Sequence, residues 1–301
     1  MTRRSSLLRT LLVIVATVAT LLPTVAPDAA QAARKNRKHA KPEVARAVRS
    51  EDINAEVVRG LAVPDGKYPF VTAIGTVNSA GGLQRQFCGG SLIAPSYVLT
   101  AAHCVAGARA EQIAVVVGQT AFGTAQGEAR TVAAIAIHPG FSQRTLTNDV
   151  AVLQLNAPVL SITPASLVRS GDSTFDFGGS GLTLVGWGNT ARSSVHHAAT
   201  RYPDRLKEAP ISVVDDASCT KKWRKIGFKK KVSMSLLLCT TARRFGSGDS
   251  GSPLFSTVGG TYVQVSLVSG GFVGTKKKVS DFGPQLSEPS IAAFIASSIG
   301  A

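Results

Sequence analysis

Gly248-Asp249-Ser250-Gly251 is the most informative segment of this 301-residue chain. It places a serine hydroxyl between glycines, directly after an acidic side chain. Two further segments lie upstream, Thr100-Ala101-Ala102-His103-Cys104 and Asn148-Asp149-Val150-Ala151-Val152-Leu153. A serine becomes an effective nucleophile when a histidine takes its proton and a carboxylate fixes the tautomer of that histidine. The three segments therefore predict a catalytic triad in the chain order His, Asp, Ser.

This chain order resembles the trypsin/chymotrypsin family of serine endopeptidases, in its secreted, bacterial form; α/β-hydrolases and subtilisins use other orders. Further matches are spread from residue 57 to the C-terminus. They are Val57-Val58-Arg59-Gly60, His138-Pro139-Gly140-Phe141, Gly186-Trp187-Gly188 and Ala209-Pro210-Ile211. Because the matches are distributed along the chain, the resemblance covers the whole of residues 57–301.

Short apolar runs alternate with Gly, Pro, Asn and Ser turns after residue 57, which predicts an all-β barrel or sandwich. Only residues 289–299 are predicted to be helical, with Ser287 as the N-cap. The family resemblance implies two six-stranded antiparallel β-barrels of the chymotrypsin type, at about residues 57–170 and 175–301, and a short C-terminal helix. The active site is then expected between the barrels. The apolar runs are residues 70–77, 91–100, 112–118, 132–138, 150–155, 182–186 and 262–269.

The resemblance also implies roles for individual residues. Ser250 is the expected nucleophile, His103 the general base and then acid, and Asp149 the buried partner of the imidazole. The backbone N–H groups of Gly248 and Ser250 are expected to form the oxyanion hole, because glycine permits the required geometry and leaves the oxygen unobstructed. Ser269 is expected to support Asp149.

The expected specificity pocket consists of Arg244, Phe245, Ser269 and Gly271. Trypsin-like enzymes carry an aspartate six residues before the nucleophile, where this chain has Arg244. A cationic pocket floor should reject Lys and Arg and accept Glu or Asp. The alternative is that Arg244 points to solvent and the pocket prefers small apolar residues, since an unpaired buried guanidinium is unfavourable. Gly270 replaces a tryptophan common in the family, so a weaker apolar wall is expected.

The N-terminal segment has the pattern of an export signal. A positively charged start precedes an apolar run at residues 11–22 that is too short to span a bilayer, and a small-residue cleavage pattern follows at residues 30–32. Residues 1–32 are therefore predicted to be a signal peptide, so the protein is expected to be secreted and extracellular, without a membrane anchor. Residues 33–56 are polar and basic and are predicted to be a propeptide; the alternative is a disordered tail that stays attached.

The resemblance also implies activation by cleavage. In this family a freed branched aliphatic N-terminus inserts into the second barrel and pairs with the aspartate that precedes the nucleophile. Val57 and Asp249 match these two parts. A buried α-ammonium group needs such a carboxylate partner. Glu56 departs from the Arg or Lys that usually precedes the cut, but an enzyme that prefers acidic side chains could cut its own precursor there.

Four cysteines in an exported chain indicate disulfides, and residue spacing alone leaves three pairings open. The family resemblance selects Cys88–Cys104, which closes the loop that carries His103, and Cys219–Cys239. No metal and no other cofactor is expected. The segment that corresponds to the family's calcium loop, residues 118–128, has glutamine at position 119, where a carboxylate is often found.

The chain is strongly basic, with 33 Lys and Arg, 18 Asp and Glu, and a formal net charge of +15. Lysine clusters at residues 221–231 and 276–278 contribute much of the excess. A solvated surface is the simpler interpretation, and anionic partners are the alternative. Specific nucleic-acid binding is not expected, because no recognition motif accompanies the lysines.

The sequence thus predicts a serine endopeptidase that is made as a zymogen, acts as a monomer, and hydrolyses proteins or peptides through an acyl-enzyme. The alternative is a catalytically silent protease homologue that acts as an anion- or protein-binding module. Such homologues usually lack a residue of the triad, and here all three are present.

Overall fold

The structure, a computed structural model, describes residues 60–175, 178–190, 202–225, 233–241, 245–273 and 278–300. All of them belong to one compact unit, Asp52–Ala301. The predicted signal peptide, the propeptide, Val57 and Arg244 lie outside the described residues.

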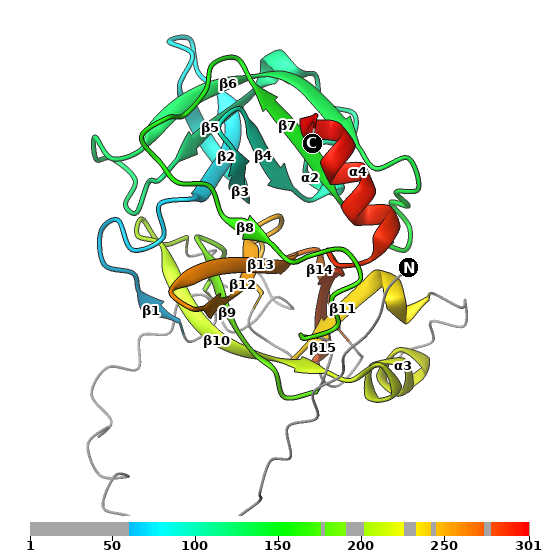
Figure 1. Cartoon of the computed structure of the whole chain (residues 1–301). Helices are drawn as coiled ribbons and strands as arrows, with labels where there is room; N and C mark the ends of the chain where they lie inside the picture. Colours follow the sequence, from blue (N-terminus) through cyan, green and yellow to red (C-terminus); the bar gives the residue numbers. More distant parts are fainter. Residues whose placement is uncertain are drawn as a thin grey trace, which may run out of the picture. The chain divides into compact units, whose positions relative to one another are not determined.

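Six antiparallel strands form a closed barrel in the order β2-β3-β4-β7-β6-β5 (Figure 1). Its core is built from β-branched and leucine side chains, which suit the pleated surface of strands. All five residues of β5 are buried, and closure leaves no sheet edge exposed. The strands are β2 (Val71–Val77), β3 (Leu83–Ala94), β4 (Tyr97–Thr100), β5 (Ile113–Val117), β6 (Glu128–Ile137) and β7 (Ala151–Leu155).

The apolar run at residues 91–100 is not one strand. Ala94 pairs with Tyr97, so Pro95 and Ser96 form the turn between β3 and β4. Proline has no N–H group to donate to a ladder, which explains the break. The turn reverses the chain, and β4 then leads directly into the histidine segment.

The second half of the chain forms a nine-stranded sheet with the path β14-β15-β11-β10-β9-β12-β13-β8, and β1 pairs with β10 (Figure 1). The pairs are antiparallel except β13–β8, which is parallel. Its strands are β1 (Leu61–Ala62), β8 (Ser166–Leu167), β9 (Gly181–Gly186), β10 (Lys207–Val214), β11 (Leu237–Thr240), β12 (Pro253–Val258), β13 (Thr261–Leu267), β14 (Gly270–Val273) and β15 (Lys278–Pro284).

The described helices are α2 (Ala102–Val105), α3 (Asp216–Lys225) and α4 (Pro289–Ile299), with 3₁₀ turns at Ala110–Gln112 and Met234–Leu236. The C-terminal helix is confirmed, but its predicted N-cap is wrong. Glu288 is the cap, and its side chain accepts hydrogen bonds from the backbone N–H groups of Ser290 and Ile291. Ser287 is instead buried, with 4% of its surface exposed.

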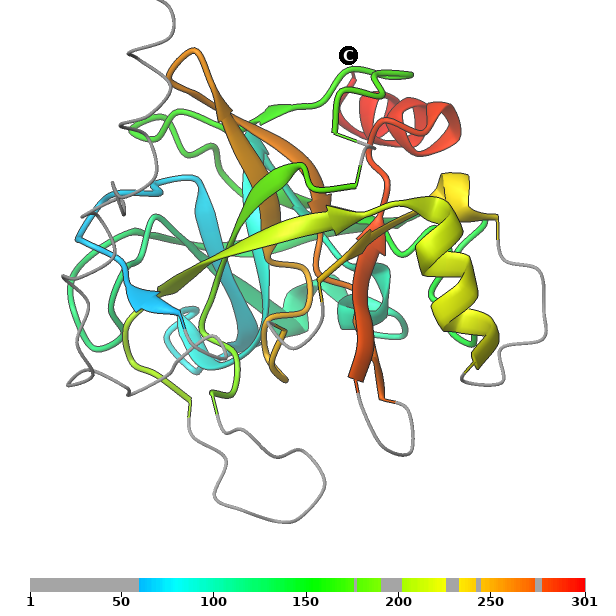
Figure 2. The same cartoon turned by 90° about the horizontal axis from the view of Figure 1, so that it is seen from below.

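Helix α3 was not predicted, because its sequence is dominated by polar and basic residues. It lies beside β15 (Figure 2). Two local features explain it: the Asp215 carboxylate accepts a hydrogen bond from the Ser218 N–H at 2.8 Å, and fully buried Cys219 is bonded to Cys239 on β11. No described helix is long and apolar enough to cross a membrane.

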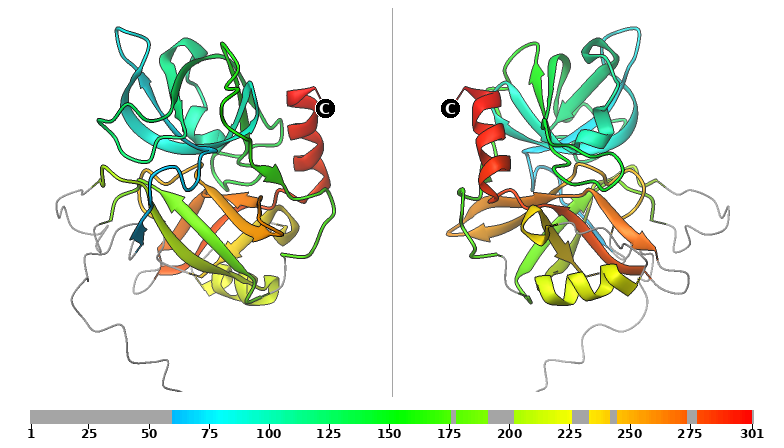
Figure 3. Two further views of the ribbon diagram at one scale, coloured as in Figure 1. Left: turned by 60° about the vertical axis from the view of Figure 1, so that its left-hand side comes forward. Right: turned by 90° about the vertical axis from the view of Figure 1, so that its right-hand side faces the viewer.

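Helix α4 packs beside the first barrel, as the side views show (Figure 3). Its buried residues Ile291 and Ile295 share one apolar cluster with Val150 and with Leu184 of β9. The ring of Phe294 stands edge-on to His138, 5.0 Å away between centroids. This cluster joins the two sheets next to the segment that holds Asp149, so both sheets contribute to the position of the candidate site.

Candidate active site

Two strand ends bring His103 and Asp149 together. His103 lies in the single-turn helix α2 after β4, and Asp149 lies just before β7. Pairing of Thr100 with Ala151 places these ends side by side. The carboxylate of Asp149 lies 2.6 Å from His103 Nδ1 and also accepts a hydrogen bond from the His103 backbone N–H at 2.8 Å. His103 and Asp149 are therefore in direct contact.

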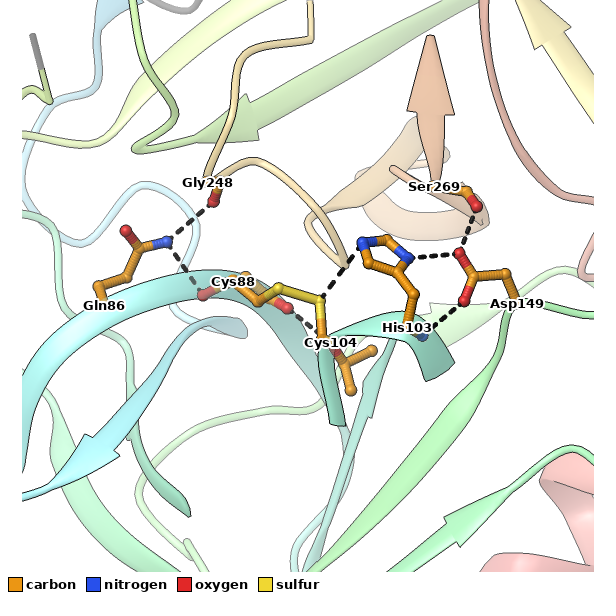
Figure 4. Close-up of a disulfide and its surroundings, with 9 residues drawn as sticks. Gln86, Cys88, His103, Cys104, Asp149, Gly248 and Ser269 are labelled. Atoms are coloured by element: carbon orange, nitrogen blue, oxygen red, sulfur yellow. Dashed lines mark hydrogen bonds and ion pairs between the residues drawn. A yellow bond between two sulfur atoms is a disulfide. The ribbon is translucent and has the colours of Figure 1, made fainter. Parts of the chain in front are cut away.

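Ser269 completes the hydrogen bonding of this carboxylate. Its hydroxyl donates to Asp149 Oδ2, the same oxygen that faces His103 Nδ1 (Figure 4). Asp149 is fully buried, and a buried carboxylate requires hydrogen-bond donors such as these. A carboxylate only accepts hydrogen bonds, so Nδ1 carries the hydrogen and Nε2 is left as the basic nitrogen.

Ser250 lies on a loop that contacts the first barrel. Its carbonyl oxygen accepts a hydrogen bond from the Gly89 N–H at 2.7 Å, and the Gly251 N–H donates to the Val268 carbonyl at 2.7 Å. Gly251 has a φ of +81°, and a Cβ atom there would lie 2.3 Å from the Gly89 carbonyl oxygen. Only glycine fits, so the chain turns sharply after the serine.

The structure records no hydrogen bond between Ser250 Oγ and the His103 ring, both of which are described. His103 Nε2 instead lies 3.9 Å from Cys104 Sγ. Nucleophile–base hydrogen bonds are often long in proteins without substrate and shorten in the complex. The two groups are thus held separately, by α2 and by the loop of residues 245–252.

The backbone amides predicted to form the oxyanion hole are available. Within the part of the chain that the structure describes, neither the Gly248 N–H nor the Ser250 N–H donates to an acceptor in the protein. Gly248 has a φ of +98°, which favours glycine. Two neighbouring N–H groups without internal acceptors can bind a developing negative charge.

The carboxylate of Asp249 fixes this loop from the inside. It is fully buried and accepts hydrogen bonds from the backbone N–H groups of Gly188 and Gly246, each at 2.7 Å. A Cβ atom at Gly186 would lie 2.1 Å from Asp249 Oδ1, and one at Gly188 would lie 2.2 Å from Asp249 Cγ. The two glycines of the Gly186-Trp187-Gly188 motif therefore leave the space that this carboxylate occupies.

The cysteines pair in the structure as Cys88–Cys104 and Cys219–Cys239. The first pair ties β3 to α2 directly beside His103 (Figure 4). The one cluster of potential metal ligands among the described residues is Cys88, His103 and Cys104. Its two cysteines form this disulfide, so they offer no thiolates.

The expected specificity pocket is only partly described, because Arg244 lies outside the described residues. Phe245 is buried, and its backbone N–H donates to Asp281 Oδ2 at 3.2 Å. Asp281 is fully buried on β15, where it pairs with Gly271 of β14. Sequence reasoning missed this buried carboxylate, since no motif surrounds it.

The absence of a side chain at Gly270 has a local consequence. A Cβ atom there would lie 3.0 Å from the ring of Phe282 and 3.2 Å from Leu146 Cδ1. Leu146 adopts a φ of +52°, which is unusual for a residue other than glycine. Leu146 and Phe282 therefore supply the apolar surface next to Gly270, although the tryptophan common in the family is missing.

A cavity of about 780 Å³ adjoins Gly248. Its lining includes Gln86 and Phe87 of β3, and Trp187 and Tyr202. Figure 4 shows Gln86 and Gly248 on the Cys88–Cys104 side of the His103 ring, whereas Ser269 lies on the other side. The cavity therefore lies on the Gln86 side of the site.

The chain is similar to known proteases. The family model described as Trypsin matches residues 57–286. Serine protease 28 from Mus musculus is 31% identical over 225 residues, 71% of this chain and 80% of that protein, and trypsin from Saccharopolyspora erythraea is 30% identical over 191 residues, 62% of this chain and 76% of that protein.

Among solved structures, the secreted serine protease VesC from Vibrio cholerae has a TM-score of 0.62 at 25% identity, covering 76% of this chain and 46% of that chain. This likeness, the closed six-stranded barrel, the second sheet and the C-terminal helix confirm the predicted chymotrypsin-type fold. The chain belongs to the trypsin family of serine proteases.

Proposed function

We propose that this protein is a secreted serine endopeptidase that hydrolyses peptide bonds through an acyl-enzyme at Ser250. The observation that carries the proposal is the buried, fully hydrogen-bonded Asp149 carboxylate on His103 Nδ1, next to a serine loop with two available amides. A structural histidine does not need this combination, and acyl transfer requires it.

The proposed chemistry follows from these positions. His103 Nε2 takes the proton of Ser250 Oγ as the oxygen attacks the substrate carbonyl carbon, and Asp149 stabilises the imidazolium that forms. The carbonyl oxygen becomes negative and accepts hydrogen bonds from the N–H groups of Gly248 and Ser250. His103 then gives its proton to the leaving amine. A water molecule, activated by the same histidine, releases the acid and restores the serine.

The cavity beside Gly248 fits the leaving-group side of a peptide. His103 Nε2 protonates the leaving amine, and this nitrogen faces Cys104 of the disulfide, towards β3 and the cavity. The acyl side would then run along Ser269 to Gly271. A substrate with residues on both sides of the scissile bond would use both regions, which favours an endopeptidase.

The zymogen proposal concerns Val57 and Asp249. A new N-terminus at Val57 would carry a positive charge. A buried positive charge needs an acidic partner, and the buried Asp249 carboxylate would supply one. N-terminal sequencing of the active protein tests this. A start at Val57 is expected, and a fully active form with an intact Glu56–Val57 bond would contradict it.

Two charged residues bear on the substrate preference. Arg244 would favour cleavage after Glu or Asp, whereas the buried Asp281 carboxylate beside Phe245 would favour cleavage after Lys or Arg. A peptide library that varies the residue before the scissile bond separates the two ideas. Faster cleavage after Glu or Asp, lost in Arg244→Ala, supports the first; faster cleavage after Lys or Arg contradicts it.

The alternative function is a silent homologue that binds anions or proteins. Part of each lysine cluster that motivates anion binding, at residues 229–231 and 276–277, lies outside the described residues. Cleavage of the same library by the wild-type protein, but not by Ser250→Ala, would exclude a silent homologue. Heparin titration of Ser250→Ala then measures anion binding without catalysis.

A further inference from the structure

Strand β3 holds the backbone of both residues that present the two available amides. The Gly89 N–H donates to the Ser250 carbonyl at 2.7 Å. Three residues earlier, the Gln86 side chain Nε2 donates to the Gly248 carbonyl at 2.9 Å and to the Cys88 carbonyl at 3.0 Å (Figure 4). One strand of the first barrel therefore fixes the carbonyl oxygens of Gly248 and Ser250.

The remaining hydrogen bonds of the loop determine which way the Gly248 N–H points. The Ser247 carbonyl accepts from the Asn189 N–H at 2.7 Å, and the Asp249 N–H donates to the Gly246 carbonyl at 3.1 Å. In a trans peptide the N–H points opposite to the C=O. The Gly248 N–H shares a peptide plane with the Ser247 carbonyl and is therefore directed away from Asn189. This direction is kept as long as the peptide planes on both sides of Gly248 keep their orientation.

We propose that Gln86 is a positioning residue for the oxyanion hole, an inference that rests on the proposed serine-protease chemistry. Glycine rotates more freely than any other residue, so the planes on either side of Gly248 need external partners. Gln86 supplies the one partner of the Gly248 carbonyl that comes from the first barrel. Its loss would let the Gly248–Asp249 peptide turn, which changes the backbone angles at Gly248 and so misdirects the N–H of the neighbouring Ser247–Gly248 peptide, which must face the oxyanion.

Glutamine suits this task chemically. Both partners are carbonyl oxygens, which only accept, so the amide must present its NH₂ group to them. The two N–H groups of Nε2 match two acceptors. A carboxamide does not titrate, so the clamp is independent of pH, whereas a carboxylate of the same shape would face two carbonyl oxygens and repel them.

The test uses a fluorophosphonate, which reacts with a serine nucleophile whatever the specificity of the pocket. Ser250 Oγ bonds to phosphorus, its proton passes to His103, fluoride leaves, and the phosphoryl oxygen occupies the oxyanion hole. The second-order rate constant is measured for wild type, Gln86→Glu and Gln86→Met, with Gln154→Glu as the control. Gln154 lies on β7 of the same barrel, is exposed, and does not line the cavity beside Gly248.

Both Gln86 variants are expected to react about 10- to 100-fold more slowly than wild type, less than the loss for a deleted oxyanion donor. Gln154→Glu should stay within about twofold of wild type. On a peptide substrate chosen from the library, kcat should fall with KM unchanged, since the interaction acts in the transition state. Melting temperatures of the variants, measured in parallel, identify a change caused by unfolding.

Three results would overturn the proposal. They are Gln86 variants that react at the wild-type rate, a rise in KM with unchanged kcat, or a rate loss that follows the loss of folded protein. If wild type itself does not react, the proposed serine-protease function fails instead. The two failures are therefore distinguishable.

Discussion

Replacing Asp149 by asparagine changes one atom in the buried hydrogen-bond network, and the structure determines where that atom goes. Oδ1 accepts from the His103 backbone N–H, which cannot become an acceptor. Oδ2 faces His103 Nδ1 and the Ser269 hydroxyl, and both can reverse their roles. The new NH₂ group therefore takes the Oδ2 position. His103 must then accept at Nδ1 and carry its hydrogen on Nε2, which can no longer take the serine proton.

We expect Asp149→Asn to lower kcat by about 10⁴-fold, or about 5 kcal/mol in activation free energy. The fold should persist, since the side-chain shape is conserved. The assay is kcat and KM on a peptide substrate, together with the melting temperature. Asp172→Asn changes a half-buried carboxylate that accepts hydrogen bonds from Thr174, away from the candidate site; it is the matched control and should retain full activity. An Asp149→Asn enzyme with more than about a tenth of wild-type kcat would refute the tautomer argument.

Two further predictions concern stability. Gly186→Ala should lower the melting temperature by roughly 2–12 °C, because its Cβ would lie 2.1 Å from the buried Asp249 carboxylate. The control is Gly181→Ala on the same strand, where a Cβ meets no atom within 4 Å. Equal melting temperatures for the two variants would contradict this reasoning. Burial and the hydrogen bond to Glu208 raise the pKa of Tyr68 to about 12, so folding retains its proton. The resulting stability is present below the unfolded pKa of about 10 and is lost as the pH rises towards 12. The free energy of unfolding of wild type should fall more steeply with pH over this range than that of Tyr68→Phe. Identical slopes for the two proteins would exclude the effect.

The fold was predictable where strands carry strong apolar patterns. β5 and β7 lie within the predicted runs, and α4 begins and ends where its pattern does. Helix α3 was missed because its position depends on the Cys219–Cys239 bond and the Asp215 cap, which outweigh a weak apolar pattern. The parallel pairing of β13 with β8 involves a strand of only two residues, which is too short for a pattern to reveal.

The residues of the proposed triad stand out in the sequence, because acyl transfer demands particular side chains within recognisable motifs. His103, Asp149 and Ser269 meet in the structure, but their catalytic roles remain proposals. Gln86 and Asp281 could not be predicted, since their positions depend on contacts across 162 and 36 residues of sequence to Gly248 and Phe245. Nothing next to them in the chain distinguishes them from ordinary strand residues.

The most direct test of the account is active-site labelling of the processed protein with a fluorophosphonate, followed by peptide mass spectrometry. We predict one label per molecule, on Ser250, and none on Ser252 or Ser247, which flank it. Ser250→Ala should not be labelled, and His103→Ala should be labelled orders of magnitude more slowly. Labelling of Ser250→Ala at the wild-type rate, or a wild-type protein that stays unlabelled while starting at Val57, would contradict the proposal that this chain is a working serine protease.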